Sequence, residues 1–516
     1  MAQRLRTVIQ ILPLALLVST LGCPDSSKPT REVKWLEANH PQLVLVISLD
    51  TLRADHLGVY GYGRPTSPAL DAFAEHAVIF EDASTTSPWT LPSHASIMTG
   101  MYPLEHGVVD QGTKMPQQVR TLAQRLGAVG YQRYAVVNSP WLKQGIFGFM
   151  RGFNIFQFVQ GGGSRVAPNT LVTDQVLHWL RQESPQPKFI FAHYIDIHSD
   201  YVSLPEHERL FSGPYEGDID GTTEQLLQLR ISDELVEGCK RDFVPERCLD
   251  ASGNSLANAI RTSQLDAAAV QHLKDRYDGG IHQTDAELGR IFSYLEESGR
   301  LEDAVIVVTA DHGEEFMEHG SVFHMGTQYQ EVIRVPLLIR GPGIPKGLRI
   351  HTPVSLVDIA PTLLHLAGAR PMLGINGLDL APLWQQVANR GSNADAHRGS
   401  DSPPSALDAA NDFTDRPIFA EAPGAQGEWR DEEQFNAVRR GRFKLHQSIG
   451  GGRVELYDLS KDPDETENIA THQPAELEAL RVLLDHRHGN DVHPKGESAE
   501  LGEEDREALR ALGYLE

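Results

Sequence analysis

The feature that most constrains the fold is a series of short apolar runs, rich in β-branched residues, that recur along the chain. The first run, residues 43–49, reads LVLVISL and ends directly at Asp50. Runs of this length and composition are typical of strands buried on both faces of a parallel sheet. Similar runs occupy residues 134–137, 189–192, 304–309 and 335–339, and helical patterns occupy residues 71–76, 121–127, 171–182 and 286–298. Their alternation predicts an α/β fold with a mostly parallel central sheet.

The composition changes after residue 390. Residues 391–412 are rich in Ser, Ala, Asp and Gly and contain two consecutive prolines, which is typical of a flexible linker or insertion. Beyond them, strand-like runs at residues 417–420, 435–439, 442–447 and 454–457 predict a small antiparallel subdomain, followed by an acidic, helix-forming tail over residues 475–516. The sequence therefore predicts a large domain over residues 41–390 and a C-terminal subdomain with its tail over residues 413–516.

The N-terminus has the pattern of an export signal. Residues 1–7 contain two arginines and no acid, and residues 8–21 form an apolar run that is shorter than the ~20 residues needed to span a bilayer. The boundary reads TLGC and resembles a bacterial lipoprotein box in which Cys23 becomes lipidated. This predicts a signal peptide over residues 1–22, a tether over residues 23–40 and a membrane-anchored protein of the cell envelope or periplasm. Plain export and a buried N-terminal helix are the alternatives.

The net charge bears on the choice of binding partner, and the cysteines bear on disulfide bonding. The chain has 46 Lys and Arg against 70 Asp and Glu, a net charge of −24, which argues against nucleic acid as a partner because phosphate backbones are bound by clustered basic residues. Apart from Cys23 there are only Cys239 and Cys248. In an exported chain they either form a disulfide or remain two unpaired thiols.

Two of the predicted strands end in metal-competent residues. Asp50 follows residues 43–49, and Asp311 and His312 follow residues 304–309. Ligands gather at the carboxyl ends of strands in such sheets. Mixed oxygen and nitrogen donors suit a divalent cation that polarises oxygens and activates a bound hydroxyl. A metal role is predicted for Asp311 and His312. For Asp50 taken alone a helix N-cap is favoured, with a metal ligand as the alternative. The acids at residues 314, 315 and 318 are expected on a solvated helix face.

A hydroxyl-rich segment, TTSPWTLPSHASIMTG, occupies residues 85–100. Prolines at positions 88 and 92 flank Thr90, and a helix is expected to start near Ser93. A hydroxyl at a helix N-terminus faces free amide donors and the positive end of the helix dipole, which suits an oxyanion site. The alternative is that Thr90 or Ser93 only caps the helix.

The segment FIFAHYIDIHSDY, residues 189–201, delivers further polar residues to a strand end. His193 lies at the end of the apolar run, and Asp196 and His198 lie beyond it. A buried histidine is usually structural, but His198 stands where site residues belong. A site role is predicted for His198, whereas for His193 taken alone a structural role is favoured and a site role is the alternative.

Taken in order, these segments resemble the sulfatase family of the alkaline-phosphatase superfamily. The matching motifs are DTLRADHLGVYGY from Asp50, SHASIMTGMYP, DIH around His198, TADHGEEFMEHG, HMGTQYQEVIRVPLLIRGPG, DIAPTLLHLAG and ELYDLSKDPDETEN. The resemblance implies an alkaline-phosphatase-like three-layer α/β core with a small antiparallel α+β C-terminal subdomain. It also implies a divalent metal cofactor beside the nucleophile and a sulfuric or phosphoric ester hydrolase.

The nucleophile segment departs from the family pattern. The family has Cys or Ser followed by x-Pro-Ser-Arg, and the first residue is oxidised to formylglycine. Here the segment reads Thr90-Leu-Pro-Ser-His94. Threonine carries a methyl group on its β-carbon, so the same oxidation would give a ketone, and formylglycine is not expected. In addition, Asp50-Thr51 and Asp311-His312 replace the adjacent Asp pair and the Asp-Asn pair of the family.

The resemblance implies roles for the remaining residues. A divalent cation (Ca²⁺, Mn²⁺ or Zn²⁺) would be bound by Asp50, Asp311, His312 and the Thr90 hydroxyl, and Thr90 would attack sulfur or phosphorus. His198 and His324 would contact the transferring group or protonate the leaving oxygen. Substrate-binding roles are expected for His94, Asn138 and His193, and His94, which stands where the family has Arg, is also placed to support the nucleophile loop.

The resulting prediction is a metal-dependent hydrolase of sulfate or phosphate esters that acts outside the cytoplasm on a small-molecule, glycan or lipid ester. Two alternatives are a phospho-headgroup transferase of the same superfamily and a catalytically inactive sulfatase-like binding lipoprotein. Loss of the formylglycine precursor favours the inactive protein, whereas retention of Asp50, Asp311, His312, His198 and His324 opposes it.

Overall fold

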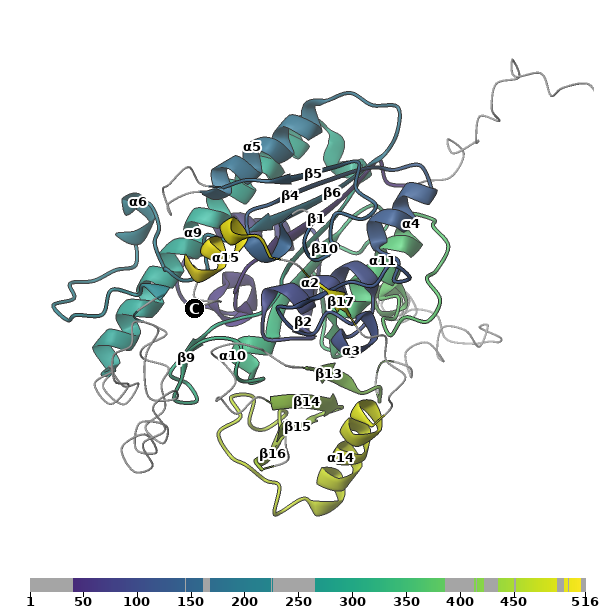
Figure 1. The fold of residues 1–516 in the computed structure, drawn as a ribbon. Helices are drawn as coiled ribbons and strands as arrows, with labels where there is room; N and C mark the ends of the chain where they lie inside the picture. The colour runs from purple at the N-terminus through teal and green to yellow at the C-terminus, as the bar shows by residue number, and fades with distance from the viewer. Residues whose placement is uncertain are drawn as a thin grey trace, which may run out of the picture. The chain divides into compact units, whose positions relative to one another are not determined.

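A nine-stranded sheet forms the centre of the computed structural model (Figure 1). The structure describes residues 40–143, 145–160, 168–223, 225, 265–385, 413, 415–421, 435–449, 452–489, 496–499 and 501–511. The strand order is β11 (Leu348–Ile350), β2 (Val78–Ser84), β10 (Arg334–Arg340), β7 (Ala304–Ala310), β1 (Leu43–Leu49), β6 (Lys188–Tyr194), β4 (Gln132–Val137) and β5 (Ile155–Phe158), with β12 (Val354–Ser355) beside β2.

The sheet is mostly parallel, as the apolar runs predict. Strands β7, β1, β6, β4 and β5 run parallel to one another. Strand β10 is antiparallel to both β2 and β7, so the run at residues 335–339 is a strand but not part of the parallel set. Strand β2 was not predicted because Glu81 and Asp82 interrupt its apolar run. Their carboxylates form ion pairs with Arg349 and Arg439.

Helices cover both faces of the sheet. Helices α1 (Pro68–Ala74) and α5 (Pro168–Arg181) pack on the long helix α9 (Ala267–Glu297), while α2 (Thr90–Thr99), α4 (Leu122–Ala128) and α11 (Ile359–Leu366) pack on one another. Figure 1 shows α5 and α9 on the opposite side of the strands from α2, α4 and α11. The predicted three-layer α/β core is therefore confirmed.

Helix α9 begins 19 residues before the predicted start at residue 286. The sequence pattern missed its first half because Gly279 and Gly280 lower helix propensity there. Both glycines are buried against the segment that follows β6. A Cβ on Gly280 would lie 3.1 Å from the Asp196 carbonyl oxygen, and one on Gly279 would lie 2.8 Å from Ser203 Oγ. Close packing, and not helix propensity, accounts for glycine at these two positions.

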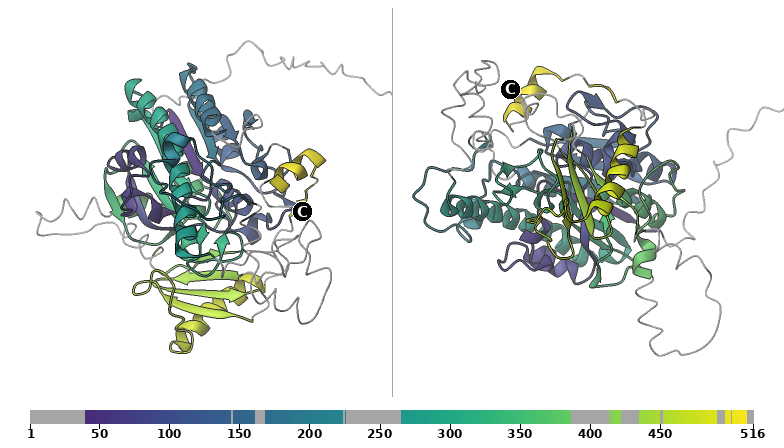
Figure 2. Two further views of the ribbon diagram at one scale, coloured as in Figure 1. Left: turned by 90° about the vertical axis from the view of Figure 1, so that its left-hand side faces the viewer. Right: turned by 90° about the horizontal axis from the view of Figure 1, so that it is seen from below.

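The small antiparallel sheet is also confirmed. Its order is β13 (Ile418–Ala420), β14 (Phe435–Arg440), β15 (Phe443–Ser448) and β16 (Val454–Asp458). Helix α14 (Pro474–His488) covers one face through Leu480 and Leu484 (Figure 2). The shorter elements are α3 (Pro103–His106), α6 (Pro205–Glu208), α10 (Gln330–Ile333), α15 (Glu503–Ala511), β3 (Thr113–Lys114), β8 (Glu315–Phe316), β9 (Val322–Phe323) and β17 (Glu497–Ser498).

Several predictions fall outside the described residues. These are the signal peptide, the tether up to residue 39 with Cys23, the pair Cys239 and Cys248, and the linker over residues 391–412. They stay predictions. Among the residues that are described, no helix is both long and apolar enough to cross a membrane.

The small sheet contacts the main domain through a buried charged cluster. Lys444 Nζ, on β15, donates to the carbonyl oxygen of Gln328 at 2.6 Å and lies 2.9 Å from Glu465 Oε1. His319 joins the cluster, with Nδ1 2.5 Å from Glu331 Oε1 and Nε2 3.1 Å from the Glu465 carbonyl oxygen. These contacts hold the segment between residues 318 and 331, which carries His324, against the C-terminal subdomain.

The cluster predicts a pH-dependent contribution to stability. Partial burial by itself would lower the pKa of His319, but the hydrogen bond and charge of Glu331 raise it to about 9. The pKa of His319 in the folded protein is above its value of about 6.5 in the unfolded chain. The ion pair therefore contributes its full stabilisation below about pH 6.5, and this contribution is lost as the pH rises through 9. In urea unfolding, His319→Gln should lower the free energy of unfolding by about 1 kcal/mol at pH 6, a figure already reduced for solvent screening. At pH 10 the variant should lower it by almost nothing.

The exposed histidine at position 76 supplies the control. His76→Gln should stay within about 0.5 kcal/mol of the wild type. A deficit of His319→Gln that is equally large at pH 6 and pH 10 would contradict the assignment of the effect to this ion pair.

Candidate active site

The candidate site lies where the central parallel strands end. Strand β1 lies between β7 and β6, with Leu49 opposite Ala310 on one side and Tyr194 on the other. The next residues of β1 and β7 are Asp50 and Asp311, so the register alone places the two carboxylates side by side. Strand β6 adds His193 on the other flank of Asp50.

The two carboxylates are buried and incompletely hydrogen-bonded. Asp311 Oδ1 accepts from the backbone N–H groups of His312 at 3.0 Å and Thr51 at 3.3 Å. Among the described residues, no hydrogen bond reaches Asp311 Oδ2 or either oxygen of Asp50. Buried carboxylate oxygens without donors are costly unless a cation binds them. The predicted capping role of Asp50 is wrong, because the next helical turn, Ala54–His56, has Arg53 as its N-cap.

The pKa values of this pair move in opposite directions. Burial and the neighbouring Asp50 carboxylate raise the pKa of Asp311 to about 6. Burial would also raise the pKa of Asp50, but His193, His198 and His312 surround it and hold that pKa below its usual range. Two carboxylates this close repel each other, and a divalent cation between them would relieve the repulsion.

His312 completes an oxygen–nitrogen donor set. Its Nδ1 lies 3.0 Å from the Gly313 carbonyl oxygen and therefore carries the proton. Its Nε2 lies 3.6 Å from Asp50 Oδ1, 3.5 Å from Asp311 Oδ2 and 3.4 Å from Thr90 Oγ1. The ligand atoms of Asp50, Asp311 and His312 all lie within 4.8 Å of one another. The residues predicted to bind a metal thus form a set that fits a divalent cation.

Thr90 is the first residue of α2. The helix begins there and not near Ser93, because Pro92 is tolerated in the first turn, where its missing N–H would have no partner. The N-cap is Trp89, so the alternative that Thr90 or Ser93 caps the helix is wrong. Ser93 Oγ instead donates to the Asp311 carbonyl oxygen at 2.7 Å, which joins α2 to the end of β7.

His94 lies one helical turn after Thr90. Its Nδ1 lies 2.8 Å from the Thr90 carbonyl oxygen, so this nitrogen carries the proton, and Nε2 lies 2.9 Å from Ser48 Oγ. The ring is fully buried, and burial lowers the pKa of His94 well below its usual value. Both nitrogens are engaged within the protein. This geometry favours support of the nucleophile turn over the predicted contact with substrate.

His198 and His324 border the same site. Their ring centroids are 5.0 Å apart, and the ring of His324 lies 4.4 Å from that of His312. Burial lowers the pKa of His198, which favours the neutral imidazole. The remaining predicted residues, His193 and Asn138, contact each other, with Nδ1 and Oδ1 3.2 Å apart. All of the predicted site residues therefore come together at one end of the sheet.

Two contributors were not predicted. Glu314 is fully buried, and its Oε1 lies 3.0 Å from His324 Nδ1, so the expectation of a solvated helix face is wrong. Tyr277, on α9, accepts the backbone N–H of Arg53 at 2.9 Å and donates to the Thr51 carbonyl oxygen at 2.6 Å. The ten-residue spacing between Glu314 and His324 is a weak signal at best. The role of Tyr277 depends on the half of α9 that the sequence pattern missed.

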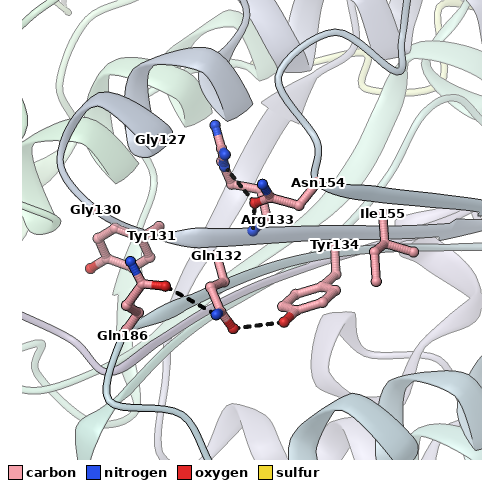
Figure 3. Close-up of a pocket in the computed structure, with 9 residues that line it drawn as sticks. All are labelled: Gly127, Gly130, Tyr131, Gln132, Arg133, Tyr134, Asn154, Ile155 and Gln186. Carbon is pink, nitrogen blue, oxygen red and sulfur yellow. Dashed lines mark hydrogen bonds between the residues drawn. The ribbon is translucent and has the colours of Figure 1, made fainter.

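A surface hollow of about 290 Å³ lies elsewhere (Figure 3). It is lined by the start of β4 and by Gly127, Gly130, Tyr131, Asn154, Ile155 and Gln186. Its polar groups bond to one another, as in the 3.0 Å contact from Gln132 Nε2 to Gln186 Oε1. The hollow lies at the amino end of β4, about 20 Å along that strand from Asn138. None of its lining residues is an Asp, a Glu or a His, the residue types that form the candidate site.

Comparison with known proteins agrees with this geometry. A family model described as "Sulfatase" matches residues 42–369, and the chain belongs to that family. The chain is accordingly a hydrolase of sulfuric or phosphoric esters, with the type of ester left open. It is 25% identical to arylsulfatase K of Mus musculus over 489 residues, which are 89% of this chain and 82% of the relative.

Solved structures show the same fold. A phosphonate monoester hydrolase of Agrobacterium radiobacter superposes with a TM-score of 0.64 at 21% identity, covering 90% of this chain and 100% of that one. A protein solved with its substrate D-glucosamine-2-N,6-O-disulfate also has a TM-score of 0.64, at 20% identity, covering 88% of this chain and 99% of its own.

The turn after β7 leads to a stability prediction. Gly313 lies between His312 and Glu314, and a Cβ there would lie 2.0 Å from the Glu331 carbonyl oxygen. Gly313→Ala should therefore force the backbone apart and lower the free energy of unfolding by about 1–3 kcal/mol in urea titration. The control is Gly63→Ala, where no atom lies within 4 Å of the added Cβ. Equal stability of the two variants would contradict the close approach described here.

Proposed function

We propose that this chain is a metal-dependent hydrolase that uses Thr90 itself as the nucleophile. The observation that carries the proposal is the position of Thr90 Oγ1. It lies at the first residue of α2 and 3.4 Å from His312 Nε2, beside two buried carboxylates with unsatisfied oxygens. A hydroxyl at this place is supported by free backbone N–H groups of the first helical turn.

Asp50, Asp311, His312 and Thr90 would bind the divalent cation. When bound, the cation would supply Lewis-acid polarisation of the ester oxygens and favour ionisation of a nearby hydroxyl. Thr90 Oγ1 would attack sulfur or phosphorus, and the bond to the leaving alcohol oxygen would break, giving an ester on Thr90. The hydroxyl proton of Thr90 would leave, and the leaving oxygen would gain one. The imidazoles of His198 and His324 border the site and are suited to both transfers.

The identity of residue 90 favours phosphorus over sulfur as the reacting atom. A formylglycine sulfate ester is released by collapse of the hydrated aldehyde, and the methyl group of Thr90 closes that route. An ester on Thr90 must instead be released by water that attacks the transferred group, which is ordinary chemistry for a phosphoryl or phosphonyl ester. The similarly folded phosphonate monoester hydrolase supports phosphorus as the reacting atom. The protein solved with a glucosamine disulfate supports a glycan ester as the alternative class of substrate.

Replacement of the nucleophile tests the proposal. Purified protein is assayed with an aryl sulfate, a phosphate monoester, a phosphodiester and a phosphonate monoester in the presence of Mn²⁺, Ca²⁺ or Zn²⁺. Thr90→Ala should lower kcat/KM by at least about 10³-fold, whereas Thr90→Ser retains a hydroxyl and should retain measurable activity. Mass spectrometry of quenched wild-type enzyme should find the phosphoryl or phosphonyl group on Thr90.

A second threonine of the same helix serves as the matched control. Thr99 is buried at the far end of α2, where its hydroxyl donates to the Ala95 carbonyl oxygen. Thr99→Ala should keep kcat/KM within a few-fold of the wild type. Activity that survives Thr90→Ala, or a formyl group detected at residue 90, would contradict the proposed nucleophile. No bound metal and no turnover on any ester would contradict the hydrolase as a whole.

We further propose that the protein is exported and anchored to a membrane through lipidated Cys23. The support is the sequence of residues 1–23, in which a basic start and a short apolar run precede the lipoprotein-like box. Expressed in a bacterium with labelled palmitate, the wild type should carry label in the membrane fraction, and Cys23→Ser should not. Label that persists in Cys23→Ser, or a wild type without label, would contradict this proposal.

A further inference from the structure

One buried nitrogen of the site has no hydrogen-bond partner among the described residues. His193 is fully buried at the end of β6, and its Nε2 makes no hydrogen bond. The nearest acidic atom is Asp50 Oδ2, at 3.3 Å. Whether this nitrogen carries a proton or a lone pair determines what it can bind. The hydrogen bonds behind the ring decide that question.

The chain of hydrogen bonds starts at the backbone. The N–H groups of Ile195 and Asp196 point at Asn169 Oδ1, at 3.2 and 3.4 Å. Backbone N–H groups can only donate, so this side-chain atom must be the carbonyl oxygen. The amide nitrogen of Asn169 then faces Thr284 Oγ1 at 2.9 Å. The orientation of the Asn169 amide is thus determined by its surroundings.

The next hydrogen bond determines which nitrogen of His193 carries a proton. Asn138 approaches Asn169 Oδ1 at 3.0 Å and must do so with its NH₂ group. The Asn138 oxygen therefore faces His193 Nδ1, at 3.2 Å, and that nitrogen must carry a proton to donate. Nδ1 carries a proton whether the ring is neutral or cationic, and in the neutral ring, the form that binds a metal, Nε2 presents a lone pair. A metal-binding histidine usually donates its other ring N–H to an oxygen acceptor, and the Asn138 amide oxygen is such an acceptor.

One distance at His193 Nε2 and two distances at His312 Nε2 match those between ligands of one cation. Metal bonds of about 2.0–2.2 Å at tetrahedral angles place neighbouring ligand atoms about 3.3–3.6 Å apart. The separation of His193 Nε2 and Asp50 Oδ2 is 3.3 Å, and His312 Nε2 lies 3.6 Å from Asp50 Oδ1 and 3.5 Å from Asp311 Oδ2. His94 is also close to Asp311, but its nitrogens are occupied by Thr90 and Ser48. Of these two histidines, only His193 has a nitrogen available to a cation.

We propose that His193 is a ligand of the same cation as Asp50, Asp311 and His312, and that Asn138 positions it. This inference rests on the proposed metal dependence. A site with two imidazole nitrogens, two carboxylates and the Thr90 hydroxyl as a fifth donor suits a borderline cation such as Zn²⁺, whereas Ca²⁺ prefers six to eight oxygen ligands. The site therefore selects Zn²⁺ over Ca²⁺. His193 and Asn138 would then act on the metal and not, as the sequence suggested, on substrate.

Metal binding measured by calorimetry tests the inference. The full chain is stripped of metal and titrated with Zn²⁺ and with Ca²⁺, and its Co²⁺ complex is examined by visible absorption. Two variants remove the nitrogen, His193→Gln and the ring-preserving His193→Phe. Both should weaken Zn²⁺ binding at least about 100-fold, change Ca²⁺ binding less than about threefold and alter the Co²⁺ spectrum. Asn138→Leu removes the support and should weaken Zn²⁺ binding about 10- to 100-fold.

Two further variants separate the possible outcomes. His446→Gln replaces an equally buried histidine of β15 and should leave Zn²⁺ binding unchanged, whereas Asp311→Asn should abolish it. If both His193 variants bind Zn²⁺ like the wild type while Asp311→Asn does not, His193 pairs only with Asp50, and the inference is wrong although metal dependence stands. A wild type that prefers Ca²⁺ overturns the inference alone. A wild type that binds no cation overturns the inference and the proposed metal dependence together.

Discussion

The repulsion between two buried carboxylates is the constraint on which the rest of this structure depends. Strands β1 and β7 run parallel and in step, so Asp50 and Asp311 lie side by side where both strands end. Burial and the adjacent charge raise the pKa of Asp311 to about 6. Imidazoles and backbone N–H groups surround the pair, and they offset only part of the cost. The unsatisfied oxygens that remain are the strongest argument in the structure for a bound cation.

Helices on both faces of the sheet hold this pair in place. Helix α2 brings Thr90 to His312, and Ser93 joins the same turn to the end of β7. On the opposite face of the sheet, Tyr277 of α9 bonds across the turn that follows Asp50, where Thr51 has a φ of 55°. Each face of the three-layer core thus contributes one fixed contact to the site.

The C-terminal subdomain takes part in the site indirectly. Lys444 and Glu465 contact the segment between residues 318 and 331, which carries His324. Glu314 then bonds to His324 from the start of the same region. The proposed proton transfer by His324 requires that its ring keep its orientation. The small sheet therefore serves as a support for one side of the site and is more than an appended domain.

Much of the fold, and the residues that make up the candidate site, could be predicted from local sequence. Apolar runs identified strands β1, β4, β6 and β7 and all four strands of the small sheet, because burial of a strand requires such a run wherever it lies. The polar residues that follow these runs identified the members of the site, since the carboxyl ends of parallel strands share one edge. Family membership followed from the same residues.

Only the tertiary structure decided the direction of β10, the burial of Glu314, the enclosed position of His94 and the lone pair of His193. These properties depend on which distant groups become neighbours. Asn169 and Asn138 set the proton on His193 only after β4, β6 and α5 have packed. The donor and acceptor roles in this series of hydrogen bonds depend on contacts between residues that are far apart in the sequence. No periodicity of the sequence indicates them.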